Sequence, residues 1–326
     1  VIWKDITTPS FGTLDNTSEV HLQAVTNYST SATFGKLFID PASGFTIMSG
    51  TPTIKTSLTV PFGSGLSFSN ANQPYIVINS GASVSIDGYL KTGKVGGAFA
   101  YNVTTPVNTL GSLQFAASTP NFTLGSASTI EYSRTTVSSS QTISALPIGV
   151  NYANLTITDS GSICNKSFPS SVTVNGTFTL NQSASTLTGC AFLNLANGAT
   201  IVRTAGALNA APTFGTSVNV TYNGTTAQTP SFEMPANGSV LSNLMINNPA
   251  GVTLGASTTV NGTLALTAGV LTTGLNIVTV AASGSTSRTA GWVNGNLRKF
   301  IPASAASATF EIGDLAANYT PVTTAF

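Results

Sequence analysis

The stretches NVTYNGTTAQTP (219–230), VLSNLMINNPAG (240–251) and STTVNGTLAL (257–266) repeat an earlier series in the same order. That series is TIEYSRTTVSSSQTI, NYANLTITDSG and SVTVNGTFTL, which begin at residues 129, 151 and 171. Corresponding positions include Tyr132 with Tyr222, Asn154 with Asn243, and Val174 with Val260. A repeat of this kind indicates a chain built from copies of one structural unit.

Hydrophobic residues recur at every second position within each copy. In SVTVNGTFTL, Val172, Val174, Phe178 and Leu180 alternate with threonine and asparagine. This period of two predicts half-buried β-strands, and no segment shows the 3.6-residue period of an amphipathic helix. The Asn-Gly steps, such as the one at 175–176, fit type I′ hairpin turns or corners of a solenoid coil, where left-handed residues are also needed.

The fold we expect is all-β, a parallel β-helix (β-solenoid) built from internal repeats with a C-terminal β-module; tandem β-sandwich domains are the alternative. A copy of about 88 residues would form about four coils, with strands about 4.8 Å apart. Short strand blocks and few large aromatic residues favour the solenoid. The expected divisions are 1–112 (irregular N-terminal solenoid or cap), 113–200 (first copy), 201–283 (second copy) and 284–326 (C-terminal β segment).

The composition indicates an extracellular or cell-surface protein. Charged residues make up 6% of the chain and hydrophobic residues 41%, with a net charge of +1. Such a chain is too hydrophobic to be disordered and lacks the basic surface that nucleic acid requires. No apolar run reaches the roughly 18 residues that would span a membrane. The surface is therefore expected to carry threonine, serine and asparagine.

Cys164 and Cys190 are the two cysteines of the chain. Because a β-helix coil takes roughly 20–25 residues, their spacing places them on adjacent coils. In a secreted protein such a pair favours a disulfide, and two buried free thiols are the alternative.

Sequons of the form Asn-x-Ser/Thr are frequent, and Asn175, Asn223 and Asn261 are the glycosylation candidates. Glycosylation would suit an extracellular fibre. The competing interpretation is that these asparagines serve only as turn residues.

Residues suited to catalysis are few and dispersed. Glycoside hydrolysis needs two carboxylates about 5–10 Å apart, and Glu131 and Asp159 are a pair that neighbouring coils could bring together. A Ser-His-Asp triad would need His21, the only histidine, which no Gly-x-Ser-x-Gly elbow accompanies. One histidine and two distant cysteines do not supply four metal ligands. We therefore expect a protein that is not an enzyme, with no metal and no cofactor.

Four stretches resemble the repetitive β-solenoid surface and adhesin-like proteins of Bacteroidetes and related environmental bacteria. They are VTYNGTTAQT (220–229), LSNLMINNPAGVTLGASTTVNGTLALTAGVLTTGLNIVTV (241–280), GWVNGNLRKF (291–300) and FEIGDLAANYTPVT (310–323). The resemblance covers about residues 115–326. It implies secretion, a parallel β-helix scaffold and a role in adhesion, matrix or surface fibres, with no catalytic residues to transfer.

The sequence leads to a non-catalytic structural protein, a self-assembling filament subunit or an adhesin stalk, as the first hypothesis. Open strand edges at the ends of a solenoid pair with other chains, which would give head-to-tail contacts between copies of this protein. The candidate strand for such a contact contains Val1, Ile2, Trp3, Ile6 and Phe11.

The alternatives are a carbohydrate-binding surface module and a polysaccharide-degrading β-helix enzyme, so extracellular polysaccharide or another cell surface is a second class of partner. Aromatic side chains on an uncharged β-surface stack on sugars. The candidates for that role are Tyr75, Tyr89, Tyr101, Trp292 and Tyr319.

Overall fold

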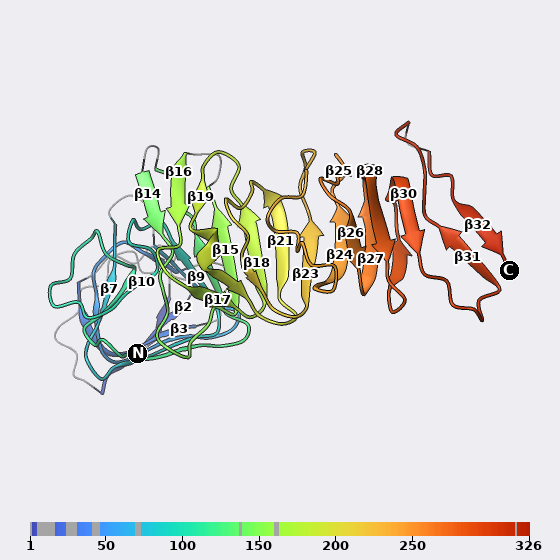
Figure 1. Ribbon diagram of the computed structural model, residues 1–326. Helices are drawn as coiled ribbons and strands as arrows, with labels where there is room; N and C mark the ends of the chain where they lie inside the picture. Colours follow the sequence, from blue (N-terminus) through green and yellow to red (C-terminus); the bar gives the residue numbers. More distant parts are fainter. Residues whose placement is uncertain are drawn as a thin grey trace. The chain divides into compact units, whose positions relative to one another are not determined.

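In the computed structural model the chain is all-β, and its parallel sheets stack as a β-solenoid (Figure 1). The structure describes residues 2–4, 17–23, 31–40, 46–68, 73–136, 139–159, 163–316 and 318–326. Over these ranges the only helical element is a single 3-10 turn, η1 (Cys190–Phe192). The parallel pairing confirms the predicted solenoid and excludes tandem β-sandwiches, whose sheets are antiparallel.

Spatial contacts divide the chain into two compact units. Unit 1 comprises residues 1–174 and 182–193, and unit 2 comprises 175–181 and 194–326. The predicted boundaries followed sequence similarity, whereas these units follow contact density, so the two divisions describe different properties.

Unit 1 contains three groups of parallel strands, in the orders β1-β2-β3-β5-β7-β11-β10 with β8 and β12 beside them, β4-β6-β9-β13-β15, and β14-β16-β19. The strands are β1 (Ile2–Lys4), β2 (Glu19–Gln23), β3 (Thr33–Ile39), β4 (Thr46–Met48), β5 (Thr53–Val60), β6 (Gly65–Phe68), β7 (Ile76–Ile78), β8 (Ser83–Ile86), β9 (Tyr89–Thr92), β10 (Phe99–Ala100), β11 (Leu113–Phe115), β12 (Asn121–Leu124), β13 (Thr129–Tyr132), β14 (Ser139–Thr142), β15 (Asn154–Thr158), β16 (Cys164–Ser167), β17 (Val172–Val174) and β19 (Leu187–Thr188).

Unit 2 has one long parallel order, β18-β21-β23-β24-β27-β29, and a second group in which β25, β26 and β30 pair with β28. The antiparallel hairpin β31–β32 follows. The strands are β18 (Thr177–Asn181), β20 (Leu193–Leu195), β21 (Thr200–Ala205), β22 (Thr213–Phe214), β23 (Val218–Tyr222), β24 (Leu241–Asn247), β25 (Val252–Thr253), β26 (Thr258–Val260), β27 (Thr263–Ala268), β28 (Val270–Val280), β29 (Ser285–Arg288), β30 (Trp292–Lys299), β31 (Ser307–Phe310) and β32 (Val322–Ala325).

The core of unit 2 is a column of side chains that stack from coil to coil. Phe178 faces Ile201, Ile201 faces Val220, Val220 faces Leu244, and Leu244 faces Leu264. All five are fully buried. Burial of each such side chain stabilises the fold by about 1.5–3 kcal/mol, so the period-two pattern in the sequence is the main determinant of the structure.

The Asn-Gly steps are corners between sheets. Asn261 and Gly262 join β26, which pairs with β28, to β27, which pairs with β24. Neither residue has a positive φ, contrary to the left-handed conformation that we expected. A Cβ on Gly262 would lie 2.5 Å from Asn243 Oδ1, so a larger residue here would displace the side chain that accepts a hydrogen bond from the Thr263 N–H.

The two copies of the repeat occupy equivalent structural positions. Tyr132 ends β13 and Tyr222 ends β23, and both side chains are fully buried. The blocks that follow form β15 and β24, and then β17–β18 and β26–β27. None of the described segments forms a helix long and apolar enough to cross a membrane.

Candidate functional site

Cys164 and Cys190 do not form the predicted disulfide, because both are buried free thiols. Strand pairing places Lys166 opposite Leu187, so the residue that faces Cys164 in this register is Ser185, about five positions before Cys190. Cys190 lies beyond the end of β19, after the left-handed Gly189 and at the start of η1, so it is not the residue opposite Cys164. The two cysteines are on adjacent coils but out of register.

The three glycosylation candidates differ in accessibility. Asn175 and Asn223 are exposed, and Asn261 is half-buried. The Asn261 amide donates hydrogen bonds to the carbonyl oxygens of Gly238 (2.7 Å) and Leu241 (3.0 Å), so it stabilises a corner. Glycosylation of these residues stays a prediction.

The two acids considered for catalysis are held in separate contacts. Glu131 accepts a hydrogen bond from the Tyr89 hydroxyl at 2.5 Å and lies 3.2 Å from Lys91 Nζ. Asp159 accepts a hydrogen bond from the Ala184 N–H at 2.7 Å. In the strand pairing Glu131 faces Thr156, so the carboxylates of Glu131 and Asp159 do not face each other.

His21 lies between two carboxylates on β2 and the end of β3. Its Nδ1 is 2.8 Å from Asp40 Oδ1 and its Nε2 is 2.7 Å from Glu19 Oε1. The hydrogen bond to Asp40, and then that to Glu19, raises the pKa of His21. Since both ring nitrogens are engaged by acids, this geometry is that of an ion-pair cluster and not of a base beside a nucleophile.

The N-terminal strand pairs within its own chain. Ile2, Trp3 and Lys4 form β1, which lies parallel to β2 with Ile2 opposite His21. Val1, Ile6 and Phe11, the other predicted contact residues, lie outside the described residues. β1 is the terminal strand of its sheet order and not an unpaired arm.

At the C-terminal end of the long parallel order of unit 2, β29 is also a terminal strand in the described part of the chain, because it pairs with β27 alone. Ser285 and Thr289 donate their N–H groups to Gly262 and Leu266 of β27 and its corner. Backbone groups of a parallel strand alternate in direction, so the N–H groups of Thr286 and Arg288 point away from β27. Such an edge is a template for another strand.

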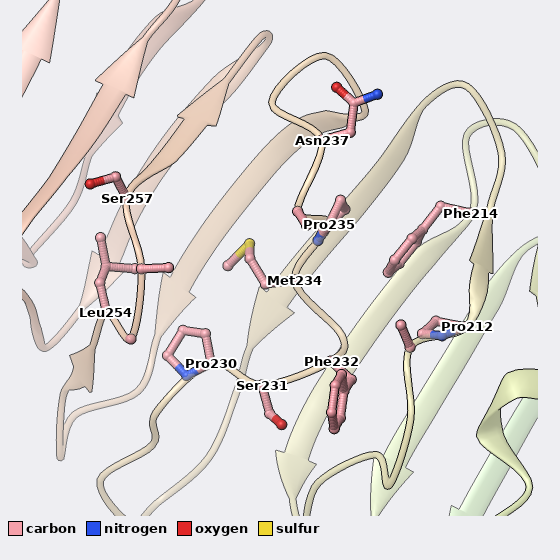
Figure 2. A pocket seen from close by; sticks show the side chains of 14 residues that line it. Pro212, Phe214, Pro230, Ser231, Phe232, Met234, Pro235, Asn237, Leu254 and Ser257 are labelled. Carbon is pink, nitrogen blue, oxygen red and sulfur yellow. The ribbon is translucent and has the colours of Figure 1, made fainter.

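The second feature of unit 2 is a groove of about 690 Å³, here called groove 2, which crosses the sides of three successive coils (Figure 2). Met234 lies between the side that carries Phe214 and the side that carries Leu254. Phe232 exposes 48% of its surface. The groove-lining residues are Ala211, Pro212, Phe214, Pro230, Ser231, Phe232, Met234, Pro235, Ala236, Asn237, Leu254, Gly255, Ala256 and Ser257.

Groove 2 is produced by one long coil. Ile201 pairs with Val220, and Leu244 pairs with Leu264, so the coils on either side are short. Val220 pairs with Leu244, and the sequence separation of these two residues is larger than that of either of the other pairs. The loop 230–237 belongs to this longer coil. In repeat proteins, insertions of this kind form loops on one face, which is often the binding face.

The loop is fixed from the interior by Glu233. Its fully buried carboxylate accepts hydrogen bonds from Arg203 Nη1 (2.6 Å), the Tyr222 hydroxyl (2.9 Å) and the Ser231 N–H (3.0 Å). Burial, and then the nearby Glu233 charge, raises the pKa of Tyr222 well above its usual range. Phe232 and Met234 flank this anchored residue, which holds both side chains at the groove.

Unit 1 contains a groove of about 550 Å³ at the equivalent position, here called groove 1. At the sequence separation that relates Asn154 to Asn243, its loop, 145–150, corresponds to 234–239, which overlaps the groove 2 loop at 234–237. The groove-lining residues are Tyr101, Ser118, Thr119, Pro120, Asn121, Phe122, Ala145, Leu146, Pro147, Ile148 and Val150.

Of the five aromatic residues suggested for sugar stacking, Tyr101 alone lines one of these two grooves. The Trp292 Nε1 donates a hydrogen bond to the carbonyl oxygen of Asp314, and Arg288 covers the ring of Tyr319 at 3.5 Å. The sequence analysis missed Phe214 and Phe232. The signal that it could have used is the PSFEMP stretch at 230–235, with two prolines around an aromatic residue.

No family, curated protein or solved structure matches this chain.

Proposed function

We propose that the protein is a non-catalytic, extracellular structural protein whose copies join head to tail through β-strand contacts, as a filament subunit or an adhesin stalk. The observation that carries this proposal is that β29 ends its sheet order and directs the N–H groups of Thr286 and Arg288 away from β27, although Glu311 and Tyr319 contact the side chains of these two residues. β1 is the terminal strand of its own sheet order in unit 1. A parallel ladder that continued from β29 of one copy to β1 of the next would repeat without closing.

Two further features support a structural role. The low charge of the chain, 6%, leaves few of the charged side chains that natural edge strands use against association. Glu131 and Asp159 are engaged in contacts that stabilise the coils, which favours the non-catalytic interpretation over a polysaccharide-degrading enzyme. The composition and the resemblance to surface proteins support an extracellular location.

The test compares Thr286→Pro with Thr286→Ala in the full chain. Both variants lose the hydrogen bond from the Thr286 hydroxyl to Glu311, but only proline removes the outward N–H of β29. We expect wild type and T286A to form filaments in negative-stain electron microscopy and T286P to give short particles. Normal filaments from T286P, or a wild-type protein that sediments as a monomer at all concentrations, would contradict the proposal.

A further inference from the structure

We infer that grooves 1 and 2 are binding sites for a neutral polysaccharide, one site in each copy of the repeat. This inference goes beyond the structural role and does not depend on self-assembly.

The first argument is recurrence. The loops 145–150 and 230–237 overlap in corresponding positions of the two copies, and each forms a wall of a groove of similar size, about 550 and 690 Å³. Both volumes fall in the range of about 300–1,000 Å³ that is usual for ligand pockets. The sequences of the two loops differ, but both lie on long coils, since Ile130 pairs with Leu155 in the first copy and Val220 with Leu244 in the second.

The second argument is chemical. None of the side chains that line either groove is ionisable at neutral pH, so a charged ligand would find no partner there. The walls offer ring faces from Phe214 and Phe232 in groove 2 and prolines in both grooves, whereas Phe122 of groove 1 is buried against Phe99 and Phe115. Sugar rings present C–H faces that pack against such surfaces and hydroxyl edges that require hydrogen bonds.

The polar groups at the grooves can form the hydrogen bonds that sugar hydroxyl groups require. Ser231, Asn237 and Ser257 are exposed beside the aromatic wall of groove 2, and Ser118, Thr119 and Asn121 line groove 1. The Tyr101 hydroxyl, at groove 1, is buried and has no hydrogen-bond partner in the described structure. A ligand hydroxyl that reached it would satisfy it.

The third argument is rigidity. Each loop is anchored from the interior by the tyrosine of its own copy: Tyr222 binds Glu233, and the Tyr132 hydroxyl accepts a hydrogen bond from the Ser144 N–H at 2.9 Å. Ser144 and Glu233 are corresponding positions of the two copies, and they precede the lining residues Ala145 and Met234. A loop that is already ordered loses little conformational entropy on binding.

A proline-rich peptide is the competing ligand, because proline-rich segments also dock in aromatic-lined grooves. Grooves that bind polyproline segments combine aromatic faces with donors for the peptide carbonyls. The aromatic residues of groove 2 are both phenylalanines, which have no donor, and its polar side chains, Ser231, Asn237 and Ser257, are spread over two coils. This spacing suits a chain with hydroxyl groups along its length.

The experiment is affinity electrophoresis of the full chain in gels that contain dextran, xylan, mannan, mixed-linkage β-glucan or, as an anionic comparison, polygalacturonate. Calorimetry with oligosaccharides of the retarding polymer follows. We expect a neutral polymer to retard the wild type and two oligosaccharides to bind per chain. Phe232→Ser should leave one oligosaccharide site and weaken retardation about 10-fold or more, because two linked sites gain affinity from each other.

Phe300→Ser is the matched control, since Phe300 is 60% exposed and lines neither groove. Circular dichroism of both variants establishes that the fold is retained. Retardation by no neutral polymer, equal effects of F232S and F300S, or binding of a fluorescent proline-rich peptide in place of every glycan would each overturn the inference. Filament formation by F232S would show that self-assembly is a separate property.

Discussion

The interiors of the two repeat copies each hold a loop beside a buried tyrosine, but the polar side chains around that tyrosine differ. Tyr132 and Tyr222 hold equivalent buried positions, each beside an anchored loop. The residue opposite the tyrosine on the preceding strand is Thr92 in the first copy and Arg203 in the second. The loop residue that meets the tyrosine is Ser144 in the first and Glu233 in the second. One copy therefore has a neutral set of side chains where the other has an ion pair.

Most of the polar side chains in each set find their hydrogen-bond or ion-pair partners within the same set. In the first copy the Tyr132 and Tyr152 hydroxyls lie 2.8 Å apart, and the Tyr152 hydroxyl donates to the carbonyl oxygen of Ser144 at 2.6 Å. In the second copy Arg203 lies 2.6 Å from Glu233. The difference teaches that the repeat conserves a backbone position and a buried tyrosine, while the remaining polar groups can change as long as they change together.

The largest expected effect comes from breaking the ion pair alone. Glu233→Ser gives the second copy the serine of the first but leaves Arg203 buried without its carboxylate. We expect a loss of about 3–5 kcal/mol in the free energy of unfolding, the range for removing one partner of a buried pair. Guanidinium unfolding followed by tryptophan fluorescence measures it.

The double variant R203T/E233S is the control, because it converts both positions to those of the first copy. It should recover at least half of the loss, since no unpaired charge is left in the core. A double variant less stable than E233S would show that the two copies are not interchangeable at these positions.

A second prediction concerns a buried cation of unit 1 that has no carboxylate. Lys94 is fully buried, its Nζ donates to the carbonyl oxygen of Gln73, and burial lowers its pKa from 10.5 to about 8. Between pH 8 and 10.5 the unfolded chain binds the proton more strongly, so the contribution of Lys94 to stability rises with pH.

The measurement is the difference in unfolding free energy between wild type and Lys94→Met at pH 7 and at pH 10. Relative to the variant, wild type should gain up to about 2 kcal/mol, since each pKa unit corresponds to about 1.4 kcal/mol and solvent screens part of it. The matched comparison is R203T/E233S, which leaves Lys94 in place and should keep the pH dependence of wild type. A difference for K94M that stays constant with pH would contradict the assignment.

The smallest effect is expected from the neutral network. Tyr132→Phe removes the acceptor of the Ser144 N–H but no charge. We expect a loss of about 1–2 kcal/mol, the cost of leaving one buried neutral donor unsatisfied. If Y132F were as costly as E233S in the same unfolding assay, the contrast between a neutral and a charged interior would be wrong.

The sequence was sufficient for the fold because the features that determine the fold are local. Alternating residues such as Val172, Val174 and Phe178 predict strands, and a repeated block predicts that the strands stack. The cysteine pairing was wrong because it depends on register. Coils differ in length, as the long coil between Val220 and Leu244 shows, and a small shift in register is enough to separate two thiols.

The grooves could not be predicted for a related reason. Groove 2 combines side chains from three coils, and the pairing of β21, β23 and β24 stacks the coils that carry Phe214, Phe232 and Leu254. The anchor of its loop joins Arg203 to Glu233, 30 positions later, with no local pattern to mark the pair. Contacts between coils of unequal length cannot be predicted from the two-residue hydrophobic period, which gives no information on register between coils.

The parallel stacking of coils also determines how the C-terminal unit responds to mechanical force. A coil such as the one from Thr263 to Ser285 is tied to its neighbour by hydrogen bonds that run along the direction of stacking. Tension along that direction loads the bonds of one coil together, and their rupture frees a single coil while the rest stays folded. Each step releases about 70 Å of chain at about 3.3 Å per residue, so the protein extends in increments and dissipates energy at every one.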